Sequence, residues 1–230
     1  NIIGLLAVLN SRQLAGFTES DQRLLRIIGI QCAQLQENAR LATEERKLHE
    51  LEKELDAARQ IQTSLLPSGM PTVAGYEFAG WYEPARQVGG DLYHADRSGD
   101  DVHLAVADVS GKGLPACLYM VNVVSNMRAL AATCPDPSQL LTRLNNTLIT
   151  TMTFGRFVTL FWVTLHPENG SLTYCNGGHN PAVLVRASGE TEWLMNGGTL
   201  LGLIPGLEFE SGEARLEPGD RLVLYSDGVT

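Results

Sequence analysis

Three aspartates stand out because each lies beside glycine or at the end of an apolar run, where a carboxylate can project from a sheet edge into a cleft. They are Asp91 in Val-Gly-Gly-Asp-Leu-Tyr, Asp108 in Ala-Val-Ala-Asp-Val-Ser-Gly-Lys-Gly, and Asp227 in Leu-Tyr-Ser-Asp-Gly. Carboxylates that converge from separate strands repel one another unless a cation neutralises them. Hard divalent cations such as Mg²⁺ and Mn²⁺ prefer such oxygen ligands. For each aspartate alone the alternative is an ordinary turn, in which aspartate beside glycine is common.

Other catalytic signatures are incomplete in this sequence. Gly111-Lys112-Gly113 lacks the spacing of a nucleotide phosphate loop, and Gly89-Gly90 lacks a dinucleotide fingerprint. Neither a Cys-x5-Arg phosphate loop nor a Gly-x-Ser-x-Gly elbow occurs. The cysteines have no Cys-x-x-Cys spacing, so we expect buried free thiols at Cys32, Cys117, Cys134 and Cys175. Water activated by a metal is the chemistry that these residues support.

Three further polar residues have more than one interpretation. His179 lies between Gly177-Gly178 and Pro181, which favours a turn in which the imidazole fixes the backbone over a general acid or metal ligand. Arg86, five residues before Asp91, is a hypothetical ligand for a substrate phosphate. Ser110 is expected to be a turn residue and not a nucleophile.

The charge and hydropathy of the chain limit the kinds of molecule that it is expected to bind. The 230 residues include 17 Lys and Arg against 26 Asp and Glu, a net charge of −9. Residues 157–230 hold nine acids and three bases, which argues against nucleic acid and against a metal-dependent nuclease with a basic groove. No apolar run approaches the roughly 18 residues of a membrane span, so we expect no membrane partner. The absence of a signal segment and of paired cysteines predicts a reducing cytoplasm.

Residues 67–230 predict an α+β domain with packed sheets. Two helices, over 114–133 and 137–152, interrupt a series of short strands. Turn sequences at 168–170, 188–189 and 218–220 are expected to join adjacent strands as hairpins. The strands are expected over 76–82, 102–109, 157–165, 171–176, 182–186, 192–194, 209–216 and 221–225.

The first 66 residues have a different character. Residues 1–40 predict a strand over 2–9 and a helix that Thr18 or Ser20 caps. Residues 41–66 carry two heptad seams, which predict a coiled coil that forms a homodimer. The alternative is a single amphipathic helix packed on its own domain. The seam residues are Leu41, Leu48 and Leu55, and Leu51, Ala58 and Leu65.

Taken together, the three aspartate segments resemble the SpoIIE-type serine phosphatases, bacterial relatives of the metal-dependent type 2C protein phosphatases. The resemblance covers residues 58–230. It includes Ala58-Arg59-Gln60-Ile61-Gln62 with Leu65-Leu66-Pro67, Leu144-Asn145, and Asn176-Gly177-Gly178-His179-Asn180-Pro181. Residues 1–40 resemble the last strand and helix of a GAF sensory domain. The resemblance implies a type 2C-like β-sandwich flanked by helices, behind a sensor remnant and a coiled-coil linker.

The resemblance also implies a metal site. Asp91 and Asp108 would share and bridge two Mn²⁺ or Mg²⁺ ions, Val109 would contribute its main-chain carbonyl, and Asp227 would hold the second side of one ion. A water between the ions would attack phosphorus in line. These residues, Asp91, Asp108 and Asp227, are therefore the expected catalytic set.

The substrate implied by the family is a phosphoserine or phosphothreonine on a STAS-domain anti-anti-sigma factor or a similar regulator. The coiled coil would transmit a signal to the metal site. The chain begins at Asn1 and stops just after a strand, so we expect a piece of a longer protein. The family pattern continues to a further metal-binding aspartate, so the chain alone is expected to be nearly inactive. The alternative function is a catalytically silent docking module with the phosphatase fold.

Overall fold

The computed structural model describes residues 4, 6, 7, 9, 17–84 and 87–229. Its contacts divide the chain into two compact units, Asn1–Glu54 and Leu55–Thr230. Most of the strand predicted over 2–9, and Arg86, lie outside the described residues. In the described ranges, no helix has both the length and the apolar character that crossing a membrane requires.

One long helix, α1 (Glu19–Leu65), runs through both N-terminal segments and into the second unit. Thr18 caps it, because the Thr18 amide and hydroxyl both donate to the Asp21 carboxylate, at 2.8 and 2.6 Å, and the Asp21 amide donates back to Thr18 Oγ1 at 3.3 Å. Of the two predicted capping residues, Thr18 and Ser20, the cap is therefore Thr18. The helix ends before Pro67, whose ring cannot follow inside a helix.

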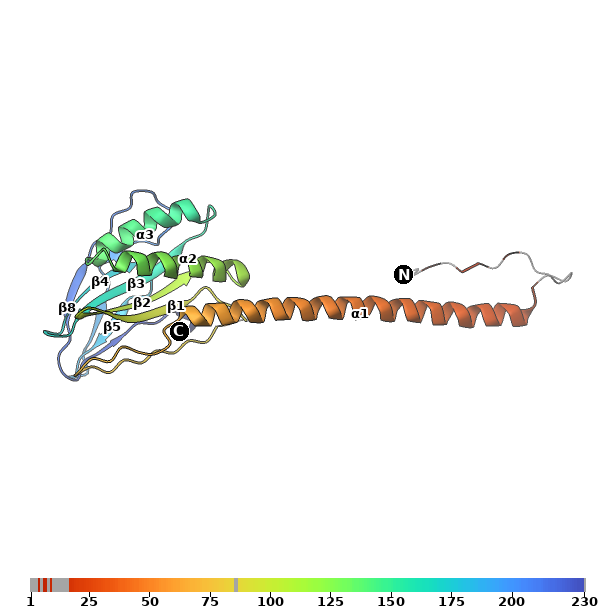
Figure 1. The fold of residues 1–230 in the computed structure, drawn as a ribbon, viewed down its shortest axis with the longest axis horizontal. Coiled ribbons are helices and arrows are strands. Elements are labelled where there is room, and N and C mark those ends of the chain that lie inside the picture. Colours follow the sequence, from red (N-terminus) through yellow and green to blue (C-terminus); the bar gives the residue numbers. More distant parts are fainter. Residues whose placement is uncertain (1–3, 5, 8, 10–16, 85–86, 230) are drawn as a thin grey trace. The chain divides into compact units, whose positions relative to one another are not determined.

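Two sheets form the body of the Leu55–Thr230 unit (Figure 1). The larger has the order β1-β2-β3-β4-β7, with β8 also paired to β4, and the smaller has the order β6-β5-β9. Every pairing is antiparallel except that of β4 with β7. The strands are β1 (Leu92–Ser98), β2 (Asp101–Val109), β3 (Val158–His166), β4 (Ser171–Gly177), β5 (Ala182–Val185), β6 (Thr191–Leu194), β7 (Gly197–Gly198), β8 (Gly212–Arg215) and β9 (Arg221–Val223).

Two helices, α2 (Leu114–Ala131) and α3 (Pro137–Thr151), lie together over one face of the larger sheet in Figure 1. The Asp136 carboxylate caps α3 by accepting from the Ser138 amide at 3.1 Å. Both helices lie within two residues of their predicted bounds. Their apolar faces are long enough to be recognised from sequence without tertiary information.

The unit has three layers with two hydrophobic cores. Along β3, Leu160 and Trp162 enter the core beneath the helices, whereas Phe161 and Val163 enter the core between the sheets. This alternation follows from the pleat of a strand that is covered on both faces. The predicted α+β fold with packed sheets is confirmed.

Two predicted elements are wrong. Residues 76–82 form no strand, and only an isolated bridge joins Val73 to Tyr76. Gly80 packs against Met70 and Tyr93, with no room for a Cβ. Tyr76 and Phe78 of this segment pack on the core between the sheets. The turn at 218–220 is no hairpin either, because it connects β8 in one sheet to β9 in the other.

Candidate functional site

Asp91 and Asp108 lie side by side at one end of the β1–β2 hairpin. Asp91 immediately precedes β1, and Asp108 is the penultimate residue of β2. Because Leu92 pairs with Ala107 in an antiparallel ladder, the next positions along the two strands are Asp91 and Asp108. Local strand pairing therefore brings together two of the three predicted carboxylates.

The ionisation of Asp108 depends on its surroundings. Burial raises the pKa of Asp108 well above its ordinary range, and the hydrogen bond to Asp91 and the charges of Asp91 and Asp227 raise this pKa further. A hydrogen bond between two carboxyl groups requires a proton between them. A divalent cation in place of that proton would neutralise the same repulsion.

The segment after β9 adds the third carboxylate. Asp227 begins the short 3₁₀ turn η1 (Asp227–Val229), and the preceding Ser226 Oγ donates to Asp91 Oδ2 at 2.9 Å. Within the described residues, no three His, Cys, Asp or Glu side chains are arranged so that they could hold a metal ion. The structure thus pairs Asp91 with Asp108, while Asp227 acts on Asp108 through its charge.

The Val109 carbonyl lies against the same hairpin end. A Cβ atom on Gly90 would lie 2.5 Å from Val109 O and 3.3 Å from Asp108 Oδ1, so only glycine permits this approach. The Val109 amide also donates to Gly90 O at 3.4 Å. The resulting donor set, carboxylate oxygens beside a main-chain carbonyl, fits the oxygen ligands that Mg²⁺ and Mn²⁺ prefer.

A buried hydroxyl beside these groups has no hydrogen-bond partner among the described residues. Tyr82 Oη lies 3.3 Å from the position of a Cβ on Gly89 and, in the described part of the chain, makes no hydrogen bond. Burial, with a contribution from the charge of Asp91, raises the pKa of Tyr82 to about 12. A protonated donor that lacks a partner next to Asp91 is consistent with a site that holds further polar groups.

The turn after Asp108 is held to the start of β3. The Ser110 amide donates to Phe157 O and the Phe157 amide donates to Ser110 Oγ, both at 2.9 Å. Arg156 Nη1 donates to Ser110 O at 3.0 Å. Ser110 is therefore a turn residue, as predicted. Arg156 belongs to no recognisable motif and could not be predicted from the sequence.

His179 connects β3 to the segment that precedes Asp227. Its Nε2 donates to the Tyr225 carbonyl at 3.1 Å, so in the neutral ring Nδ1 accepts from Thr159 Oγ1 at 2.8 Å. Burial lowers the pKa of His179, against weaker opposing effects of Tyr225, Asp91 and Asp227. With both ring nitrogens bonded, His179 fixes backbone, as the turn interpretation predicts.

The end of α1 reaches the same region. Gln62, only 1% exposed, donates from Nε2 to Gly89 O at 2.7 Å and accepts from the Gly89 amide at 3.2 Å. Gly89 is two residues before Asp91. The buried Gln62 side chain therefore connects the long helix to the loop that carries a candidate metal ligand.

Comparisons with known proteins agree with this arrangement. A family model described as stage II sporulation protein E (SpoIIE) matches residues 98–230. The phosphoserine phosphatase RsbU of Bacillus subtilis (strain 168) is 31% identical over 182 residues, which cover 79% of this chain and 54% of RsbU.

Solved structures share the fold. The RsbU and RsbW domains of a Mycobacterium tuberculosis protein match with a TM-score of 0.57 and 26% identity, over 63% of this chain and 40% of that one. The SiaA PP2C domain of Pseudomonas aeruginosa matches with a TM-score of 0.65 and 20% identity. The match covers 76% of this chain and 71% of that one. The chain spans about half the length of RsbU. On the match to its C-terminal 133 residues, the chain belongs to the SpoIIE family.

Proposed function

We propose that this chain carries the catalytic part of a metal-dependent protein serine/threonine phosphatase in bacterial signal transduction. The observation that carries the proposal is the half-buried Asp91–Asp108 pair, whose repulsion a divalent cation would relieve. The family match and the similarity to a phosphoserine phosphatase support the reaction class.

Two Mn²⁺ or Mg²⁺ ions are the proposed cofactors. Asp91 and Asp108 would hold them jointly, with the Val109 carbonyl as a further ligand and Asp227 on the second side of one ion. When bound, such ions neutralise the phosphate charge and lower the pKa of a coordinated water toward neutrality.

The chain's own residues orient these ligands. Ser226 donates to one oxygen of Asp91 and so restricts the rotation of that carboxylate. Ser110 and Arg156 hold the turn that follows Val109. His179 fixes the backbone at Tyr225, two residues before Asp227. No protein side chain is needed as a nucleophile in this arrangement.

The decisive test is hydrolysis of p-nitrophenyl phosphate and of phosphoserine peptides by the protein that contains this chain. We expect turnover with Mn²⁺ or Mg²⁺, none with excess chelator, and a loss of at least about a hundredfold in Asp108→Asn, because a bridging carboxylate would be missing. Calorimetric titration of Asp108→Asn with Mn²⁺ should show weakened binding. Turnover that resists chelation would contradict the mechanism, and binding of phosphopeptide without any turnover would favour the docking module.

The proposed substrate is a phosphoserine or phosphothreonine regulator, of the STAS-domain anti-anti-sigma type. The similarity to RsbU supports a regulatory pathway of this kind. So does the Mycobacterium tuberculosis relative, in which an RsbU domain and an RsbW domain occur in one protein.

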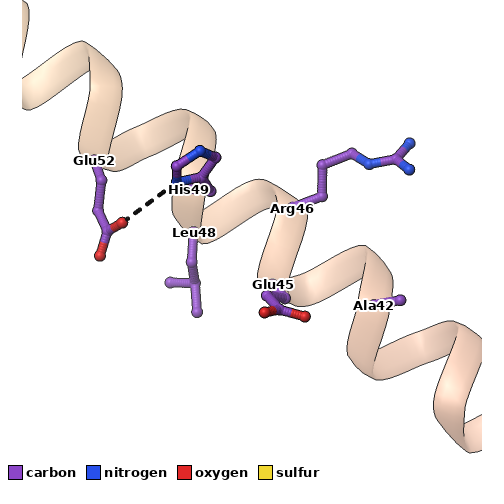
Figure 2. Close-up of a pocket in the computed structure, with 6 residues that line it drawn as sticks. All are labelled: Ala42, Glu45, Arg46, Leu48, His49 and Glu52. Carbon is purple, nitrogen blue, oxygen red and sulfur yellow. Dashed lines mark ion pairs between the residues drawn. The ribbon is translucent and has the colours of Figure 1, made fainter.

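Residues 41–54 of α1 are the proposed dimer interface. Leu41, Leu48 and Leu51 are 49, 62 and 52% exposed, whereas Leu55 and Leu65 are partly covered. Figure 2 shows Leu48 on the same side of the helix as Glu45 and Glu52, the arrangement of an apolar seam with charged flanks. Through Gln62, a change in the helix pair would reach the loop that ends at Asp91.

A further inference from the structure

Acidic residues are distributed very unevenly along this acidic chain. Residues 109–135, 137–167 and 199–207 contain no Asp or Glu, although the whole chain has 26. These ranges include all of α2 and α3, the turn between α3 and β3, and the loop after β7. Their formal charges are all positive and belong to Lys112, Arg128, Arg143 and Arg156.

The same segments expose large apolar side chains. Leu114 and Leu118, on the first two turns of α2, are 42 and 62% exposed. Phe154, in the turn between α3 and β3, is fully exposed, and Leu203 and Ile204 in the loop after β7 are 40 and 48% exposed. Apolar groups gathered next to one another in water are typical of an interaction site.

Hydrogen bonds show that α2 adjoins the turn between α3 and β3, and that the loop after β7 adjoins α3. Tyr119 Oη and Thr153 Oγ1 are 2.6 Å apart, which joins α2 to the turn that bears Phe154. The buried Asn145 of α3 donates to Ile204 O at 2.9 Å and accepts from the Gly202 amide at 2.8 Å, which holds the loop against α3. We call this surface the acid-free face, defined by Leu114, Leu118, Phe154, Leu203 and Ile204.

The acid-free face borders the candidate metal site. Arg156, two residues after Phe154, donates to Ser110 O in the turn that follows Asp108. A Cβ on Gly202 would lie 3.5 Å from Arg156 O, so the loop after β7 lies against the same residue. A protein seated on this face would lie next to the carboxylates.

We infer that the acid-free face is the docking surface for the phosphoprotein substrate, and that the substrate presents acidic and apolar residues around its phosphoserine. This inference rests on the proposed function. The phosphate and its acidic neighbours complement segments whose own formal charges are all positive, of which Arg156 lies beside the turn after Asp108, and opposite potentials favour encounter and correct orientation. A second copy of this chain fits less well, because a two-fold symmetric contact would place the same bases against themselves.

The test compares a small substrate with peptides. The probes are p-nitrophenyl phosphate and two phosphoserine peptides with the same leucines, one with glutamates and one with lysines at the flanking positions. The variants are Phe154→Ser, whose fully exposed side chain cannot support the fold, and Phe154→Ser with Leu118→Ser. Trp193→Ser, 54% exposed on β6 of the smaller sheet, is the matched control.

We expect the unmodified protein to prefer the glutamate peptide, and the double variant to lose about tenfold in kcat/KM on it, mainly through KM, as for truncated interface anchors. Activity on p-nitrophenyl phosphate should stay within about twofold, since truncated interface anchors act through docking and not on the reacting group. Preference for the lysine peptide, or equal losses on both substrates, would overturn the inference. So would a dimer in sedimentation that these variants convert to monomers.

Failure of the proposed function gives a different result. If the unmodified protein hydrolyses none of the three probes, binding of a fluorescein-labelled glutamate peptide is followed by anisotropy. Binding that Phe154→Ser weakens and Trp193→Ser does not would support the docking surface without catalysis. Equal binding by all three proteins would overturn it.

Discussion

Burial, a hydrogen bond to Asp91 and the charge of Asp91 raise the pKa of Asp108, because the β1–β2 hairpin sets the two carboxyl groups close together. Neither residue is unusual in sequence, and each lies in a context that also suits a turn. Their strand register makes them a pair, because antiparallel pairing at Leu92 and Ala107 leaves the next two positions adjacent. Ser226, Arg156 and Tyr82 take part through tertiary contacts, and no local pattern could have identified them.

A second titratable cluster lies on the same strands, further from the carboxylates. His103 Nδ1 is 3.6 Å from Asp96 Oδ1, and the His103 ring packs against Trp162 with ring centroids 5.3 Å apart. Burial lowers the pKa of His103, and the charge of Asp96 opposes this effect only in part. The charges of His94, Asp101 and His166 also act on the His103 ring.

We expect stability to fall on mild acidification because of His103. Its folded pKa is below the ordinary value of about 6.5, so the unfolded chain binds more protons as pH falls through that value. This contribution to stability is therefore complete above about pH 6.5 and is lost below it. Urea unfolding between pH 5.5 and 7.5 should show a shallower dependence in His103→Gln. His49→Gln, at an exposed position on α1, is the control, and an unchanged slope in His103→Gln would contradict the assignment.

At the scale of elements, the sequence predicted those whose pattern is local. The helices α2 and α3 and most strands have apolar periodicities that predict them without tertiary information, and these elements form in the folded protein. The strand β1 was missed because Leu92–Ser98 is largely polar, and its burial depends on pairing with β2. The short β7 was missed because two glycines carry no strand signal, and only its neighbour β4 makes it a strand.

The contact between α1 and the Gly89 loop gives a prediction at this scale. Gln62→Ala would remove both hydrogen bonds from the half-buried Gly89 amide and carbonyl, at a cost of about 1–3 kcal/mol in unfolding free energy. We expect weaker Mn²⁺ binding as well, because Gly89 is two residues from Asp91. Calorimetry and urea unfolding measure both. Gln60→Ala, at an exposed position on the same helix, should change neither, and equal effects of the two variants would mean that the contact is unimportant.

For the whole molecule, the oligomeric state depends on the exposed part of α1. We expect a dimer in sedimentation at tens of micromolar, on the order of the Kd of a short coiled coil, and a monomer for Leu48→Lys with Leu51→Lys. Lysines in the seam would be buried without partners. The downstream leucines are unsuitable for this test, since Leu65 packs on the core of its own unit. A monomeric unmodified protein would contradict the proposed interface.

The hydrogen bond from Ser226 to Asp91 joins residues that are 135 positions apart. At a ribosomal rate of about 5–20 residues per second, Ser226 is synthesised roughly 7–27 seconds after Asp91. The β1–β2 hairpin can pair during that interval, because its contacts are local. The proposed activity cannot begin until the segment with Ser226 and Asp227 has left the ribosome, so a nascent chain that already contains the hairpin would stay silent.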